Sequence, residues 1–236
     1  MLDIVLFAAF PYVAVALAVV GGIVRYYGDR FSFSSHSSQF LENRVLFWGS
    51  VSWHYGIIVV LLAHIAALSF SGTWGDLVAN PTRLYTLEVI GIALGLAALI
   101  GLTALSLRRV LNARATVVTA KSDWVLLAVL LAQVFLGMWV ALGYRWGSDW
   151  YVHTAAPWVH SLFKLQPDVT TVTVLPWVVK AHMLGGFVLI ALFPFTRLVH
   201  VVTVPLTYLW RPYQVVIWNR RSAPLEHAVS GGFIPG

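Results

Sequence analysis

Five long apolar runs dominate this chain of 236 residues and leave it few possible folds. The runs extend over residues 2–24, 47–71, 84–107, 124–144 and 174–202. A helix needs about 20 mostly apolar residues to cross the hydrocarbon core of a bilayer, and each run reaches that length. Hydrophobic residues make up 59% of the sequence and charged residues only 10%, which leaves little material for a water-soluble domain. The sequence therefore predicts an all-α integral membrane protein with five transmembrane helices.

The first run is expected to remain as a helix and not to be removed as a signal peptide. It carries Asp3 where a signal peptide would carry basic residues, and no small-residue cleavage site follows it. The chain has no cysteine, which excludes disulfides, zinc-thiolate sites and iron–sulfur clusters held by its own side chains. A redox cofactor in this chain would need other ligands.

The lysines and arginines are distributed unevenly over the segments that connect the runs. Of the 15 in the chain, 11 lie on the side reached after the first, third and fifth runs, and 4 lie on the opposite side. Because these residues are enriched on the cytoplasmic side, the N-terminus is predicted to lie outside and the C-terminus in the cytoplasm. The net charge of +6 is interpreted as a topology signal, so nucleic acid is not expected as a partner. Arg25, Arg108 and Arg109 are interpreted as topology residues only.

We expect residues 1–210 to form the membrane domain and residues 211–236 to form a cytoplasmic tail. The longest connection, residues 145–173, contains several tryptophans and two prolines, a composition typical of a segment at the membrane interface. It is expected to be partly helical.

Four histidines lie within the second and fifth runs, where imidazoles are costly. His54 and His64 are ten residues apart, which corresponds to about 15 Å along a helix. His182 and His200 are 18 residues apart, about 27 Å or five helical turns, so both should point to the same side of helix five. Because helices two and five are antiparallel, His54 and His200 form a predicted inner pair, and His64 and His182 a predicted outer pair.

A metal centre would satisfy these imidazoles most simply. A polar group buried in hydrocarbon without a partner costs several kcal/mol. Neutral imidazole is a common metal ligand, and one histidine from each of two facing helices can hold a haem iron from both sides. The pattern predicts two haems between helices two and five, with irons about 21 Å apart. Gly56 and Gly185 would let a flat macrocycle or a neighbouring helix come close.

Several short motifs resemble one known family over nearly the whole chain. They are "FPY" in the first run, "SSQFL" before the second, "HYGI" with "AH" ten residues after its histidine, "LRR" after the third, and "HMLGG…LFPFTRLVHVVTVPLTYLWRPYQVV" near the end. In these motifs the chain resembles the cytochrome b (gamma) subunit of membrane-bound respiratory nitrate reductases. The resemblance implies that His54 and His200 bind the inner haem iron, and that His64 and His182 bind the outer one.

The resemblance also implies the function. Two haem b groups would be the cofactors, and quinol would be oxidised near the outer face of the cytoplasmic membrane. Electrons would pass to an iron–sulfur beta subunit and a molybdenum catalytic alpha subunit on the cytoplasmic side, where nitrate is reduced. The tail, residues 211–236, would contact these subunits and become ordered in the complex.

Candidates for the quinol site are Arg83, which best matches a basic family position, Glu88 as an acceptor of a quinol proton, and Lys180 as a further cation. Arg83 could instead extend to the interface, and Glu88 could pair with it. Arg197, three residues before His200, could pair with an inner-haem propionate or anchor the helix end.

Two other functions remain open from the sequence. The chain could be the quinone-interacting dihaem anchor of a different oxidoreductase, including one that reduces quinone. It could also be a non-redox membrane protein in which the histidines form a proton relay.

Overall fold

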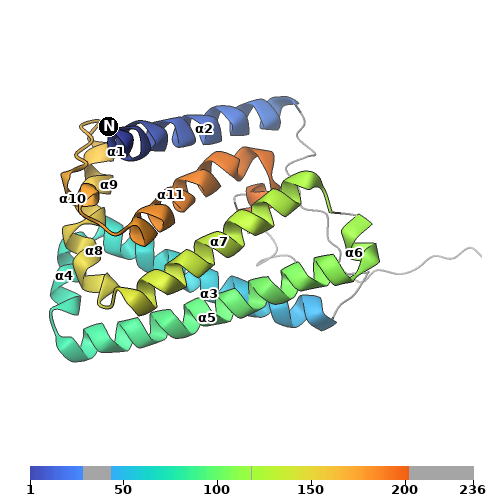
Figure 1. Ribbon diagram of the computed structural model, residues 1–236, viewed down its shortest axis with the longest axis horizontal. Helices are drawn as coiled ribbons and strands as arrows, with labels where there is room; N and C mark the ends of the chain where they lie inside the picture. Colours follow the sequence, from blue (N-terminus) through green and yellow to red (C-terminus); the bar gives the residue numbers. More distant parts are fainter. Residues whose placement is uncertain (29–43, 118, 202–236) are drawn as a thin grey trace, which may run out of the picture. The chain divides into compact units, whose positions relative to one another are not determined.

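The computed structural model describes residues 1–28, 44–117 and 119–201, and all regular structure in these ranges is helical (Figure 1). Five of the helical segments are long and apolar enough to cross a membrane: residues 2–28, 47–69, 81–111, 121–143 and 177–195. The predicted all-α fold with five candidate spans is therefore confirmed. The chain divides into two compact units, Met1–Thr203 and Val204–Gly236, and every described helix belongs to the first. The predicted tail, residues 211–236, lies outside the described residues.

The spans are built from longer and shorter elements. The first comprises α1 (Leu2–Ile4), a π-helical turn η1 (Val5–Ala9) and α2 (Phe10–Gly28). The next three are α3 (Arg44–Ser69), α5 (Pro81–Leu111) and α7 (Lys121–Gly143). The fifth is α11 (Trp177–Leu192), followed by the 3-10 turns η3 (Phe193–Phe195) and η4 (Arg197–Val201). The short helices are α4 (Ser71–Val78), α6 (Ala113–Val117), α8 (Gly147–His153), α9 (Ala155–Phe163) and α10 (Thr170–Thr173).

Two of the spans begin with side chains that cap the first turn of the helix. At α5 the Asn80 side chain accepts hydrogen bonds from the amides of Thr82 and Arg83 at 3.0 and 3.2 Å, and Pro81 occupies the first helical position. Both features favour a helix start, because the first amides have no acceptor within the helix. At α7 the carboxylate of Asp123 accepts a hydrogen bond from the Ala120 amide at 3.0 Å, which places a negative charge in the first turn.

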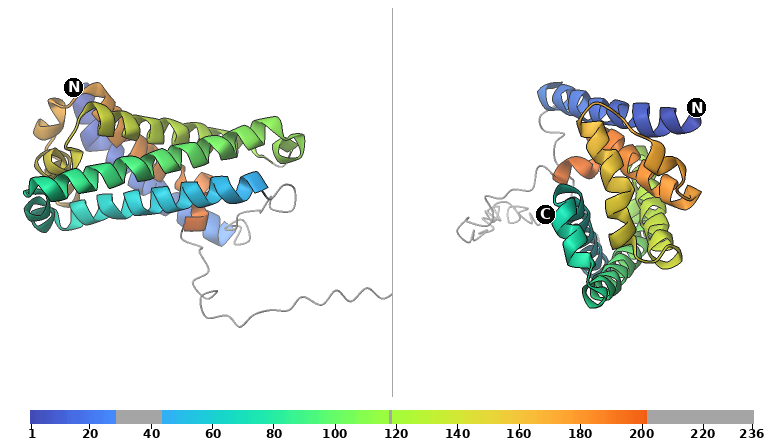
Figure 2. Two further views of the ribbon diagram at one scale, coloured as in Figure 1. Left: turned by 90° about the horizontal axis from the view of Figure 1, so that it is seen from below. Right: turned by 90° about the vertical axis from the view of Figure 1, so that its left-hand side faces the viewer.

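The spans pack in the order α2, α11, α7, α5, α3 (Figure 2). The closest approach is between α3 and α5, where glycines face the neighbouring backbone. A Cβ atom at Gly56 would lie 2.6 Å from the carbonyl oxygen of Leu94, and one at Gly101 would lie 2.5 Å from the amide nitrogen of Trp53. Any larger side chain would push the two helices apart, so these glycines set their separation.

The short helices α4, α8, α9 and α10 lie at the end of the bundle where α1 begins, and α6 lies at the opposite end (Figure 1). We call these the α8 end and the α6 end. At the α8 end Trp158 of α9 is only 2% exposed, and its indole N–H donates to the carbonyl of Phe7 at 2.8 Å. The aromatic connection is therefore partly helical, as predicted, and it packs on the first span.

The prediction of one continuous fifth helix to residue 202 was wrong. The α-helix ends at Leu192, Thr196 is extended at φ −128° and ψ −176°, and the two flanking turns are 3-10. Pro194 accounts for the break, because proline has no amide hydrogen to continue an α-helix and restricts the residue before it. The argument that five regular turns align His182 with His200, and the iron spacing derived from it, therefore does not hold.

Candidate functional site

The candidate site is built around the histidines of α3 and α11. In His54, His64 and His182 the ring nitrogen Nδ1 faces a backbone carbonyl oxygen. The partners are Ser50 at 2.8 Å, Val60 at 2.8 Å and Gln133 at 3.1 Å, respectively. A carbonyl oxygen only accepts, so a neutral ring carries its proton on Nδ1 and keeps the lone pair on Nε2. Metal-bound histidines commonly donate their second ring N–H to such a carbonyl, so the arrangement suits ligation through Nε2.

The two residues of the predicted outer pair, His64 of α3 and His182 of α11, lie within electrostatic range of each other. The His64 side chain is exposed in the described chain, and Tyr151 of α8 lies edge-on to its ring with a centroid distance of 6.3 Å. Burial raises the pKa of the Tyr151 hydroxyl above its usual value of 10.0, so the phenol stays neutral at physiological pH. Apart from its place in an aromatic connection, Tyr151 has no feature in the sequence that predicts this contact.

His182 is held against α7 by two residues of that helix. The Gln133 side-chain amide donates to the His182 carbonyl at 3.0 Å, while the Gln133 carbonyl accepts from the His182 ring. The imidazole lies over Gly137, where an added Cβ atom would come within 2.8 Å of the His182 ring. Gly185 lies directly under the Gln133 side chain, so a Cβ atom there would overlap Oε1 of Gln133. A neighbouring helix therefore accounts for the glycine at position 185.

The inner pair is described only in part. His54 is half-buried, and its Nδ1 also lies 3.1 Å from Oγ of Ser50. Gly56 of the same helix packs against the α5 backbone, so a neighbouring helix also accounts for this glycine. The backbone of His200 lies in η4, but its side chain lies outside the described residues. The pairing of His54 with His200 stays a prediction.

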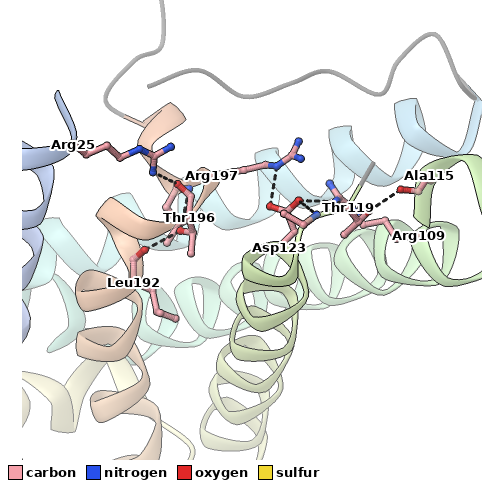
Figure 3. Close-up of polar contacts among 10 residues, drawn as sticks. Arg25, Arg109, Ala115, Thr119, Asp123, Leu192, Thr196 and Arg197 are labelled. Atoms are coloured by element: carbon pink, nitrogen blue, oxygen red, sulfur yellow. Dashed lines mark hydrogen bonds and ion pairs between the residues drawn. The ribbon is translucent and has the colours of Figure 1, made fainter. Parts of the chain in front are cut away.

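Arg197 has a carboxylate partner that the sequence did not predict. Its Nε donates to Oδ1 of Asp123 at 2.8 Å, and Nη1 of Arg109 lies 3.8 Å from Oδ2 of the same carboxylate (Figure 3). The Asp123 side chain is only 4% exposed. The signal in the sequence is the acidic residue Asp123, immediately before the fourth apolar run.

The three candidates for the quinol site are not brought together. Arg83 lines an open cavity of about 250 Å³ with Leu77, Thr82, Thr86 and Leu87, and its Nη2 donates to the Asp76 carbonyl at 3.4 Å. Glu88 accepts a hydrogen bond from the Ser148 amide at 2.9 Å and so caps α8. Lys180 pairs with Asp3 at 3.2 Å and donates to the Thr173 carbonyl at 2.9 Å. Glu88 and Lys180 thus have structural partners, which leaves Arg83 as the residue beside a cavity.

Comparison with known proteins identifies the family. The family model described as the nitrate reductase gamma subunit matches residues 3–219. The chain belongs to this family. The predicted resemblance is confirmed, and together with the five apolar spans it makes the chain a multi-pass membrane protein.

Three relatives show how far the similarity extends. The nitrate reductase gamma chain of Bacillus subtilis (strain 168) is 31% identical over 223 residues, which cover 92% of this chain and 98% of the relative. The respiratory nitrate reductase 2 gamma chain of Escherichia coli (strain K12) is 27% identical over 220 residues, 91% of this chain and 96% of that one. The nitrate reductase-like protein NarX of Mycobacterium tuberculosis (strain ATCC 25618 / H37Rv) is 34% identical over 216 residues, 89% of this chain. The chain spans about a third of the length of NarX, of which 33% is covered.

Proposed function

We propose that this chain is the dihaem cytochrome b subunit of a respiratory nitrate reductase in the cytoplasmic membrane. In this role it oxidises quinol and transfers the electrons toward an iron–sulfur beta subunit and a molybdenum alpha subunit, which reduces nitrate. One observation carries the proposal: three histidines on two spans are held with Nδ1 on a backbone carbonyl, and two of them, His64 and His182, lie within electrostatic range of each other.

The residues present fit haem as the resident cofactor. His64 and His182 would bind the outer iron through Nε2, and His54 and His200 would bind the inner one. When bound, haem supplies one-electron transfer at a potential that depends on its axial ligands and on neighbouring charge. The contribution of the protein is to hold the imidazoles: the carbonyls of Ser50, Val60 and Gln133 fix the protonated nitrogen and the plane of each ring.

The quinol site in this proposal lies at the α8 end, which the positive-inside rule places outside. Arg83, near the start of α5, lines the cavity there, and its guanidinium can donate to a quinone oxygen or to a haem propionate. His64 and Tyr151 lie at the same end of the bundle. Glu88 and Lys180 are the secondary candidates, because each already holds a structural contact.

A haem count with a reduced-minus-oxidised spectrum tests the proposal. The chain is purified in detergent with the proteins that accompany it, and a quinol analogue is added as reductant. Two b-type haems that are reduced by quinol and reoxidised by nitrate are the expected result. Quinol-reducible haems that nitrate does not reoxidise would assign the chain to a different oxidoreductase. An intact preparation without haem would contradict the redox function and favour a proton relay.

A further inference from the structure

The break in the fifth span exposes backbone groups that an unbroken helix would pair. We call residues 193–201 the break segment; it carries Arg197 and His200. The hydroxyl of Thr196 donates to the Leu192 carbonyl at 2.9 Å and accepts from the Leu198 amide at 3.3 Å. These two hydrogen bonds give partners to the Leu192 carbonyl and the Leu198 amide. The carbonyls of Pro194 and Thr196 are satisfied from another helix.

Arg25 of α2 holds one side of the break segment. Its Nη1 donates to the Pro194 carbonyl at 2.7 Å. The same nitrogen donates to the Thr196 carbonyl at 3.1 Å (Figure 3). One turn earlier in α2, a Cβ atom at Gly21 would lie 2.8 Å from Cγ of Pro194. The glycine thus lets α2 approach the proline ring, and the arginine binds the carbonyls on either side of Phe195. The interpretation of Arg25 as a topology residue only was therefore incomplete.

Asp123 of α7 holds the other side of the break segment. One carboxylate oxygen accepts from Nε of Arg197 at 2.8 Å, and the other caps α7 at the Ala120 amide at 3.0 Å. Arg109 of α5 lies 3.8 Å from the second oxygen and donates to the Thr119 hydroxyl at 3.4 Å. A buried carboxylate in a membrane span is costly unless it is paired, and here two arginines surround it. Because Asp123 sits in the first turn of α7, it ties the break segment to a rigid helix end.

These contacts act close to the predicted inner ligand. A 3-10 helix completes a turn in about three residues, so one turn separates the backbone of Arg197 from that of His200. Fixing Arg197 and the carbonyls of Pro194 and Thr196 therefore fixes the start of the turn that carries His200. The regular α-helix ends at Leu192, so its hydrogen bonds do not fix the position of His200.

We infer that Arg25 and Asp123 are positioning residues for the inner haem. They hold the break segment between α2 and α7 so that His200 can bind the inner haem iron. The inference rests on the proposed function, in which His200 is an inner ligand. Loss of either residue should change the inner haem and leave the outer haem, held by His64 and His182, as it is.

The test uses the complete complex in its membrane and measures each haem separately. Low-temperature electron paramagnetic resonance and a potentiometric titration are recorded for Asp123→Asn, Arg25→Gln and Arg25→Lys. A His54→Ala variant identifies the inner signal by its loss. Exposed residues at the α8 end supply matched controls for the carboxylate and the guanidinium, Asp168→Asn and Arg145→Gln.

The expected result is a shift or loss of the inner-haem signal in Asp123→Asn and Arg25→Gln, with the outer haem and both controls like wild type. Arg25→Lys should restore the inner haem, because Nη1 alone serves both carbonyls and one ammonium group can replace it. Unchanged inner haem in both variants would overturn the inference, and so would equal shifts of both haems. If Asp123→Asn does not accumulate, the two Arg25 variants decide the question. A wild-type complex without haem would instead overturn the proposed function.

Discussion

Substitution of Gly185 by alanine tests the packing that holds His182, and the next residue supplies a matched control. A Cβ atom at Gly185 would overlap Oε1 of Gln133 and lie 3.2 Å from its Cδ, whereas one at Gly186 would have nothing within 4 Å. Both changes occur in the same helix and give the same gain in helix propensity. The difference between Gly185→Ala and Gly186→Ala therefore isolates the contact with Gln133.

The magnitude follows from what the overlap displaces. The obstructing atom is the far end of the flexible Gln133 side chain, which can move aside at little packing cost. Moving it breaks its 3.0 Å hydrogen bond to the His182 carbonyl, and such a bond contributes about 0.5–1.5 kcal/mol. Gly185→Ala should therefore be about 0.5–1.5 kcal/mol less stable than Gly186→Ala. At about 2–4 °C per kcal/mol for a chain of this size, its melting temperature should be about 1–6 °C lower.

Thermal denaturation of the two variants in the same detergent, followed by tryptophan fluorescence, measures this difference. Removing the obstructing side chain gives an internal check, because in a Gln133→Ala background Gly185→Ala should be as stable as Gly186→Ala. Equal melting temperatures for the two single variants would refute the reasoning, since nothing else in the surroundings distinguishes the two glycines so sharply.

Four further predictions concern the haems and the quinol site. His64→Ala should lose the outer haem and quinol oxidation, which pyridine haemochrome analysis and quinol–nitrate assays measure; two retained haems would exclude His64 as a ligand. His54→Ala should lose only the inner haem in the same analysis, and loss of the outer haem alone would reverse the pairing. Arg83→Ala should raise the KM for quinol while both haems are retained, and unchanged kinetics would leave Arg83 as an anchor. Lys180→Gln should leave quinol kinetics unchanged, because its ammonium group is already bound by Asp3 and the Thr173 carbonyl, and loss of the partly exposed ion pair should lower stability by about 0–1 kcal/mol; a raised KM for quinol would return Lys180 to the quinol site.

The sequence predicts the spans well because they depend on a property summed over about 20 residues. All five predicted runs overlap the five candidate spans of the structure. The approach of His64 to His182 could also be anticipated, because the depth of each residue follows from the direction of its span and a rise of about 1.5 Å per residue; their pairing as ligands stays a prediction. That argument works only where the helix is regular. It holds for α3 over the interval from His54 to His64 and fails in the fifth span after Leu192.

The break itself had a signal in the sequence, namely Pro194 inside the fifth run. The mean hydropathy around Pro194 stays high because its neighbours Phe193 and Phe195 are apolar, so hydropathy does not reveal the break. The contacts that stabilise the break could not be predicted. They join residues about 170 and 74 positions apart, Arg25 with Thr196 and Arg197 with Asp123, and they depend on which spans become neighbours. The packing order α2, α11, α7 brings them together, and no local pattern specifies that order.

The same distinction between local and tertiary contacts separates the histidines. In His54 and His64 the ring nitrogen Nδ1 lies against the carbonyl oxygen of the residue four positions earlier. In an α-helix the backbone amide of the histidine also donates to this carbonyl. Any histidine inside a helix has such a carbonyl within reach, so the Nδ1 contacts of these two rings lie within α3. His182 instead uses the Gln133 carbonyl of α7, and Gly137 and Gly185 must both be small for the two helices to meet there. The proposed outer site would therefore join an imidazole held by a carbonyl of its own helix to one held by a neighbouring helix, which would make the contact between α7 and α11 the determinant of its geometry.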